Sequence, residues 1–163
     1  MKIKKFMAMM IAAVTLCAGF TSCGDDDDDN TVPAAESLAG TYTGTLTISV
    51  MGSESTDTVS YVITKEDDTH VKMTIPAAGS GAMALPSITV DNIPVTTSTV
   101  AGAEIVSASL ESASGTITVN DAEKSYTFSD IVIVGQNKTA AINYSLQYGK
   151  MPMAMVCAFT GNK

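Results

Sequence analysis

Apolar and hydroxyl-bearing residues alternate over most of the sequence after residue 36. In residues 41–50, Tyr42, Leu46, Ile48 and Val50 are apolar, whereas the residues at odd positions are Thr or Ser. Successive side chains of a strand point to opposite faces of a sheet, so this run predicts a strand with one buried and one solvent-facing side. The same alternation recurs in residues 59–63, 71–75, 117–119, 142–148 and 151–159.

Short polar or glycine-containing segments separate these runs, at residues 51–54, 65–68, 120–124, 135–138 and 148–150. Such segments are typical of hairpin turns, which join antiparallel neighbours. No helical spacing is present downstream of residue 23. A sheet of about eight to ten strands tends to curl, and closure removes its exposed edges. The sequence therefore predicts an all-β fold over residues 36–163, an antiparallel up-and-down barrel of about eight strands.

The N-terminal segment has the pattern of an export signal. Lys2, Lys4 and Lys5 precede a 15-residue apolar run at residues 6–20, which is shorter than the roughly 20 residues of a bilayer-spanning helix. This pattern predicts a cleaved signal peptide, residues 1–22. Residues 20–23, Phe-Thr-Ser-Cys, resemble a bacterial lipobox, whose cysteine receives a diacylglyceryl group. The usual Leu is replaced by Phe20, as in the looser forms of Bacteroidetes lipoproteins. Lipidation of Cys23 is predicted; the alternative is an ordinary cleaved signal with a passive Cys23.

Five consecutive acids follow the predicted lipidation site. A run of like charges repels itself and stays extended, so residues 23–35 are interpreted as a lipidated acidic tether. The run is either a solvated spacer or, because it resembles the export signal of surface lipoproteins in Bacteroidetes, an address for transfer to the outer face of the outer membrane. The acids concerned are Asp25, Asp26, Asp27, Asp28 and Asp29.

Four short motifs in order resemble the calycin-like β-barrel domain of Bacteroides lipoproteins. Residues 38–45, Leu-Ala-Gly-Thr-Tyr-Thr-Gly-Thr, resemble its opening, with Gly-x-Tyr where lipocalins carry Gly-x-Trp. Residues 88–95 resemble its middle, and residues 148–153 and 159–163 its last strand. The resemblance implies a lipocalin-like barrel and the location of a lipoprotein in the outer membrane. It implies no settled ligand, because a fold does not define a function.

Charge makes nucleic acid a poor partner. The 163 residues carry 9 basic and 17 acidic side chains, for a formal charge of −8. Removal of the signal peptide takes away three lysines and no acid, which leaves −11. Such a field repels phosphates.

Catalytic and metal-binding patterns are absent from the sequence, and we expect no enzyme, no cofactor and no metal site. His70 is the one imidazole and lies on the solvent-facing parity of its strand. Cys157 is the one thiol left after lipidation of Cys23, and its parity predicts a buried, inert side chain. The run 66–68, Glu-Asp-Asp, is interpreted as a hydrated hairpin tip rather than a Ca²⁺ loop. Asp130 breaks an apolar alternation, which favours a β-bulge at that point.

The remaining hypothesis concerns binding. An eight-stranded barrel is either filled by its own side chains or holds one small ligand. Adaptable methionines and two tyrosine hydroxyls on the predicted inner face favour a small apolar or amphiphilic ligand near the last strand, the candidates being Met73, Tyr144, Tyr148, Met153 and Met155. A packed interior, with the barrel serving as an accessory subunit that contacts other outer-membrane proteins, is the alternative.

Two modification signals are also present. Asn137-Lys138-Thr139 formally fits N-glycosylation and is interpreted as a chance match. Asp57-Thr58-Val59 resembles the acceptor sequence of Bacteroides protein O-glycosylation, with Thr58 expected to point outward from a turn.

Overall fold

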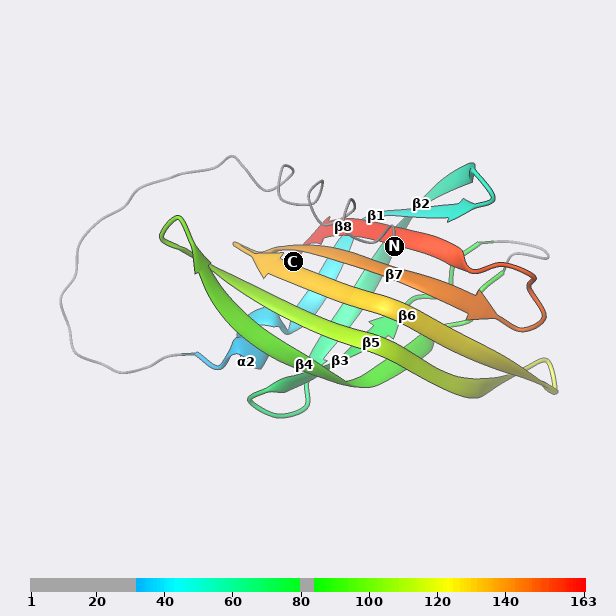
Figure 1. Cartoon of the computed structure of the whole chain (residues 1–163), viewed down its shortest axis with the longest axis horizontal. Coiled ribbons are helices and arrows are strands. Elements are labelled where there is room, and N and C mark those ends of the chain that lie inside the picture. Colours follow the sequence, from blue (N-terminus) through cyan, green and yellow to red (C-terminus); the bar gives the residue numbers. More distant parts are fainter. Residues whose placement is uncertain (1–31, 80–83) are drawn as a thin grey trace. The chain divides into compact units, whose positions relative to one another are not determined.

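A computed structural model describes residues 32–79 and 84–163. In this part of the chain, eight antiparallel strands close into a barrel in which each strand pairs with its neighbours in sequence and β1 pairs with β8 (Figure 1). The predicted all-β, up-and-down barrel of about eight strands is confirmed. The predicted signal peptide, Cys23 and the acids at 25–29 lie outside the described residues. The elements are α2 (Ala34–Leu38), β1 (Gly40–Val50), β2 (Ser53–Lys65), β3 (His70–Ile75), β4 (Ile88–Val100), β5 (Ala103–Val119), β6 (Ala122–Gln136), β7 (Thr139–Tyr148) and β8 (Met155–Asn162).

Tight turns set the hairpin connectivity. The turns at 51–52, 101–102, 120–121 and 137–138 each have two central residues with positive φ. Positive φ at both central residues defines a type I′ turn, whose backbone twist matches the right-handed twist of the two strands that it joins. Three of these turns lie in segments that the sequence predicted as breakers. The turn at Ala101-Gly102 was missed because no polar cluster marks it, and the two long strands that it joins, β4 and β5, were therefore not delimited.

The predicted bulge is present in β6. The β6–β7 register shifts between Ser129 and Val132, and Asp130 has a φ of 54°. Asp130 is exposed, whereas Phe128 before it and Ile131 after it are buried. The bulge therefore switches the buried parity of the strand, as the break in the apolar alternation indicated.

A short helix, α2, covers one end of the barrel, which corrects two expectations. No helix was predicted after residue 23, and Ala34 and Ala35 were predicted to belong to the tether. Both lie in α2, and Ala35 and Leu38 are buried. Five residues are too few for a helical period to be visible.

Hydrogen bonds hold α2 on the barrel. The Tyr42 hydroxyl donates to the Leu38 carbonyl (2.9 Å). The ammonium of Lys163 donates to the carbonyls of Ser37 and Ala39, at 2.8 Å each.

The middle of the barrel is filled by its own aromatic side chains. The Tyr61 ring on β2 lies 4.4 Å from that of Phe159 on β8, and the Phe128 ring lies 5.4 Å from that of Tyr144 on β7. The Tyr61 and Tyr144 hydroxyls are 2.7 Å apart and hydrogen-bonded. Because β2 and β7 are not neighbours in the sheet, this hydrogen bond crosses the interior. The four side chains are 0–3% exposed.

Candidate functional site

The end of the barrel opposite α2 carries partly exposed apolar side chains. Figure 1 shows the tips of the β1–β2, β5–β6 and β7–β8 hairpins gathered at this end. We call its inward-facing apolar residues the mouth residues. They are Val50 on β1, Ile117 on β5, Tyr126 on β6, Tyr148 at the end of β7 and Met151 after it. Tyr126 and Tyr148 pair directly across β6 and β7. Barrel mouths of this kind are common ligand sites.

Parity explains why the C-terminal half of β5 contributes to the mouth. In β5 the more buried positions are even at Val106 and Ala108 but odd at Ala113 and Ile117. Ala113 pairs with the buried Phe128, so the odd positions share its inward face. Exposure of Glu111 and Ser112 marks the switch, opposite the β6 bulge. Ile117 was predicted as a strand residue, but the switch of buried parity was not predicted, because the Ser, Ala and Gly residues of this segment give little hydrophobic contrast.

Tyr148 supplies a polar group at the mouth. Its side chain is 6% exposed. Among the described residues, its hydroxyl has no hydrogen-bond partner, yet no buried side-chain oxygen or nitrogen there is unpaired. The hydroxyl therefore reaches solvent. The ammonium of Lys124 lies 5.5 Å from the centroid of the ring, within the range of a cation–π contact.

The predicted ligand residues do not form one cluster. Met73 is fully buried, and the Tyr144 hydroxyl is occupied by Tyr61. Met155 is 1% exposed and pairs with Leu146 below the mouth. Met153 is 49% exposed and lies in a turn, because β8 begins only at Met155. The continuous strand predicted over residues 151–159 is therefore wrong in its first part. Of the five residues, Tyr148 is the one that belongs to the mouth.

The Cys157 thiol is not activated for nucleophilic chemistry. Cys157 is fully buried, and burial raises the pKa of its thiol to about 11, although a hydrogen bond with Tyr144 opposes the shift. The prediction of a buried cysteine is confirmed, and its protonated thiol is a poor nucleophile near neutral pH. His70 is half-buried, and its Nδ1 lies 3.0 Å from both carboxylate oxygens of Asp67.

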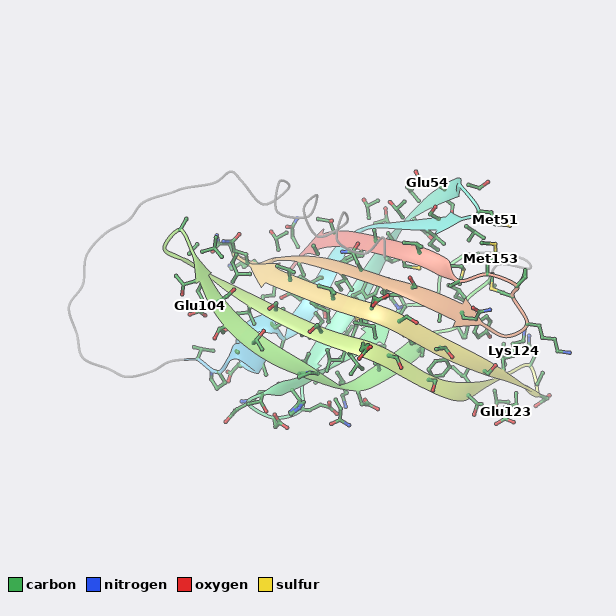
Figure 2. All side chains as sticks on the ribbon, viewed as in Figure 1. Met51, Glu54, Glu104, Glu123, Lys124 and Met153 are labelled. Carbon is green, nitrogen blue, oxygen red and sulfur yellow. The ribbon has the colours of Figure 1, made fainter. Side chains whose placement is uncertain are left out.

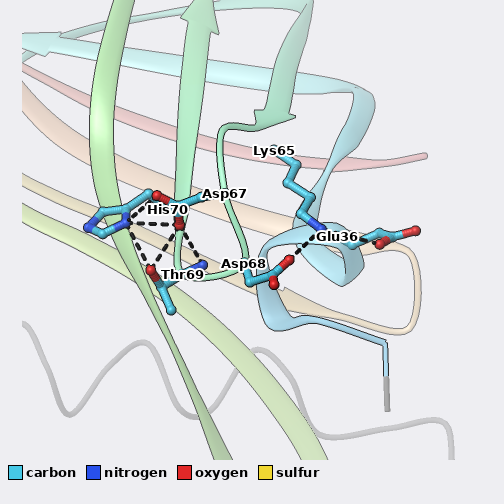
Figure 3. Close-up of polar contacts among 6 residues, drawn as sticks. All are labelled: Glu36, Lys65, Asp67, Asp68, Thr69 and His70. Carbon is cyan, nitrogen blue, oxygen red and sulfur yellow. Dashed lines mark hydrogen bonds and ion pairs between the residues drawn. The ribbon is translucent and has the colours of Figure 1, made fainter. Parts of the chain in front are cut away.

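The three carboxylates of the acidic turn between β2 and β3 have different partners, and Figure 3 shows the contacts of two of them, Asp67 and Asp68. Asp67 accepts hydrogen bonds from the Thr69 backbone N–H and hydroxyl, at 2.7 and 2.8 Å. Asp68 pairs with Lys65 at 2.6 Å, and Lys65 also lies 3.6 Å from Glu36 of α2. Glu66 accepts from the backbone N–H of Asn92, at 2.6 Å. Within the described ranges, no group of three or more His, Cys, Asp or Glu residues is placed to hold a metal ion.

These contacts predict a stability change at low pH. Hydrogen bonds from the Thr69 backbone, the Thr69 hydroxyl and His70, in that order, lower the pKa of Asp67 from 3.8 to about 2. A carboxyl with a lowered pKa in the folded state stabilises the fold above its unfolded pKa, and the contribution disappears as the pH falls from about 4 to about 2. We expect Asp67→Asn to lower the melting temperature at pH 7 and to melt like the wild type near pH 2. Asp91→Asn, at an exposed acid of β4, is the matched control. A constant difference at all pH values would contradict the assignment.

Thr58 lies in the middle of β2 rather than in a turn, which corrects its expected position. It pairs with Thr45 of β1 and is exposed. Its backbone N–H donates to the Asp57 carboxylate, at 2.8 Å. Glycosylation of Thr58 stays a prediction.

An eight-stranded antiparallel barrel with up-and-down connectivity and one end covered by a short N-terminal helix defines a calycin-type fold. Residues 38–162 match the model of the calycin-like beta-barrel domain family, and the chain belongs to this family. No curated protein matches the sequence.

A solved structure of another protein shares the fold. It is the crystal structure of a "putative outer membrane protein" from Bacteroides fragilis NCTC 9343, with a TM-score of 0.58 and 22% sequence identity. The match covers 82% of this chain and 54% of that one, so this chain spans about half the length of its structural relative. Among the described residues, no helix has the length and hydrophobicity needed to cross a membrane.

Proposed function

We propose that this protein is a lipid-anchored outer-membrane lipoprotein that faces the medium, and that its non-catalytic barrel binds a small apolar or amphiphilic molecule at the mouth. The observation that carries the binding proposal is the contrast between the two parts of the barrel. Its middle is filled by the Tyr61, Tyr144, Phe128 and Phe159 side chains, whereas the mouth residues are apolar and, apart from Tyr148, only partly buried. The free hydroxyl of Tyr148 gives an amphiphilic guest a polar group to orient on.

Support for the location comes from three features. The lipobox-like sequence that ends at Cys23 provides an attachment point, and the five acids behind it resemble a surface-export address. A protein of the same fold is described as a putative outer-membrane protein of Bacteroides. A non-catalytic role agrees with the raised pKa of the Cys157 thiol.

A second function, docking to another outer-membrane protein, has an observation in its favour. Met51 and Met153 are 78% and 49% exposed, and Figure 2 shows both at the same end of the barrel, away from Glu104. Exposed methionines on an adaptable surface suit contacts with apolar surfaces of varied shape. An accessory subunit would use these tips rather than the mouth residues between the strands.

The expected result at the mouth is a loss of probe binding when the space is filled. Val50→Trp adds a large side chain among the mouth residues, and we expect it to weaken binding of a fluorescent apolar probe such as 1-anilinonaphthalene-8-sulfonate by about tenfold, which corresponds to roughly 1.4 kcal/mol. Val100→Trp makes the same change at an exposed site on the β4–β5 tip, and it should leave binding unchanged.

Three outcomes separate the two functions. Weaker binding in Val50→Trp alone supports the mouth. Equal binding in both variants and the wild type contradicts it. If the double substitution Met51→Ser and Met153→Ser removes probe binding while Val50→Trp does not, the probe binds at the exposed methionines. That result would favour docking to another protein over ligand binding at the mouth.

A further inference from the structure

The second half of β5 has a neighbouring strand on one side only. Residues 95–100 of β4 pair with residues 103–108 of β5, and the pairing stops there. On the other side, β6 pairs with β5 as far as Val119. In the described part of the chain, no further strand pairs with residues 109–119. Figure 1 shows the β5–β6 hairpin extending beyond the end of β3 at the mouth end. We call residues 109–119 the β5 edge.

The pairing between β4 and β5 ends for a local reason. Val95 donates its backbone N–H to the Thr69 carbonyl, at 2.8 Å, and successive N–H groups of a strand point to opposite edges. Pro94 would therefore supply the next donor toward β5, but proline has no N–H. Next to it, Asn92 has a φ of 55° and donates its N–H to the Glu66 carboxylate, at 2.6 Å. These contacts hold β4 toward the β2–β3 turn, so it leaves β5 at Pro94.

The β5 edge lacks the features that protect most exposed strand edges. Natural sheets guard such edges with proline, lysine, a bulge or a covering segment. Residues 109–119 contain neither proline nor lysine, and their pairing with β6 shows no register shift. Alternate residues of an edge strand present unpaired N–H and C=O groups, which can bind the backbone of an added strand. The β5 edge is therefore able to accept one.

Acidic side chains surround the β5 edge. Glu111 is its one charged residue, and it is exposed. The segments that follow around the barrel at this end, residues 88–94 of β4 and 53–61 of β2, carry no lysine and three exposed acids, Asp91, Glu54 and Asp57. Among the described residues, none of these four acids takes part in an ion pair. Lys124 of β6 has its ammonium over the Tyr148 ring of β7, on the far side of β6 from the edge.

We propose that the β5 edge binds an extended segment of another protein, in which basic residues alternate with apolar ones, and that this segment adds to the sheet as a strand beside β5. Its backbone pairs with the free N–H and C=O groups of residues 109–119. Its basic side chains lie on the outer face, beside the exposed Ser114 and Thr116. Its apolar side chains continue the inward row of Ala113 and Ile117.

Charge favours this partner over a second copy of the chain. A second copy would bring the same acids to the same edge, and like charges across an interface oppose association. A basic strand meets opposite charge instead, which raises both the rate and the specificity of binding. Because the four acids are exposed, we expect each one to contribute a factor of about two to five in affinity.

Fluorescence anisotropy with labelled peptides and the purified protein tests the proposal. The probes are the basic peptide Lys-Val-Lys-Val-Lys-Val-Lys and its counterparts with Thr or Glu in place of every Lys. We expect the basic peptide to bind at least about tenfold more tightly than the acidic one. The basic peptide N-methylated at every peptide nitrogen keeps its charge but cannot donate to a strand, and it should lose binding. Hydrogen exchange should show new protection at residues 109–119.

Variants of the protein separate strand addition from general attraction to an acidic surface. Ser114→Lys adds a positive charge at an exposed position of the β5 edge, and we expect it to weaken the basic peptide about fivefold or more. Thr45→Lys makes the same charge change at an exposed position of β1, which has β2 and β8 on its two sides. It should change the affinity less than about twofold. Native circular dichroism spectra establish that both variants fold.

Several results would overturn the proposal. They are equal binding of the N-methylated peptide, protection at the mouth residues or at residues 53–61 of β2 in place of the β5 edge, and a Ser114→Lys protein that binds like the wild type. A doubled mass in sedimentation equilibrium without peptide, lost in Ser114→Lys, would assign the edge to a second copy and would also overturn it. Binding of the apolar probe at the mouth is a separate measurement and does not depend on these results.

Discussion

Gly44→Ala is expected to unfold the barrel or to lower its free energy of unfolding by about 3 kcal/mol or more, since overpacking against rigid backbone is among the most damaging single changes. Gly44 on β1 pairs directly with Gly161 on β8, where the first and last strands close the barrel. A Cβ at Gly44 would overlap the Thr160 carbonyl oxygen and the Gly161 Cα. Backbone atoms in a ladder cannot rotate away as a side chain can, so β1 and β8 would have to separate.

Urea denaturation followed by circular dichroism measures this effect. Thr45→Ala changes the next residue of the same strand, which is exposed, and it should cost no more than about 0.5 kcal/mol. Total stabilities of domains are about 5–15 kcal/mol, so the Gly44 variant should lose a large share of the wild-type value. A Gly44→Ala protein as stable as the Thr45→Ala protein would show that the β1–β8 junction is not closed as described.

Cys23→Ala is expected to abolish membrane retention completely. Cys23 lies outside the described residues, and the expectation rests on the lipobox-like sequence before it. Stable anchoring requires more than one acyl chain, which a diacylglyceryl group supplies, and the mature sequence offers no second cysteine near the N-terminus. Detergent phase partitioning and membrane fractionation of cells that express each form measure the change. Retention of the alanine variant in the detergent phase would contradict lipidation at this position.

Replacement of Asp25 to Asp29 by alanine is the matched control for the anchor. This variant keeps Cys23 and should therefore stay in the detergent phase. If the acidic run is the surface address, the protein should also become resistant to protease added to whole cells, whereas the wild type is digested. Equal digestion of both forms would identify the run as a spacer.

The barrel was predictable because its information is local. The alternation of apolar and polar residues in 41–50, 59–63 and 142–148 follows directly from the pleat of a strand. Turns such as Asn120-Asp121 are predicted by their residue types. The β6 bulge was visible for the same reason, since Asp130 interrupts an apolar alternation. The family resemblance drew on the same stretches, and the match over residues 38–162 confirms it.

The candidate sites were less predictable because they depend on distant parts of the chain. The parity of Met153 predicted a strand residue, but Met153 precedes β8, which begins only at Met155. Tyr144 and Tyr148 are equivalent by alternation, yet the Tyr144 hydroxyl binds Tyr61, which is 83 residues away. No local pattern distinguishes an occupied hydroxyl from a free one.

The sequence by itself determined the all-β class, the antiparallel connectivity and the buried state of Cys157, because neighbouring residues alone establish which face of a strand is apolar. Only the tertiary structure decided that α2 covers one end and that aromatic side chains from β2, β6, β7 and β8 fill the middle. Those features arise when closure of the sheet brings together side chains far apart in the chain. Their positions are determined by strand register and barrel curvature, which no short stretch of sequence encodes.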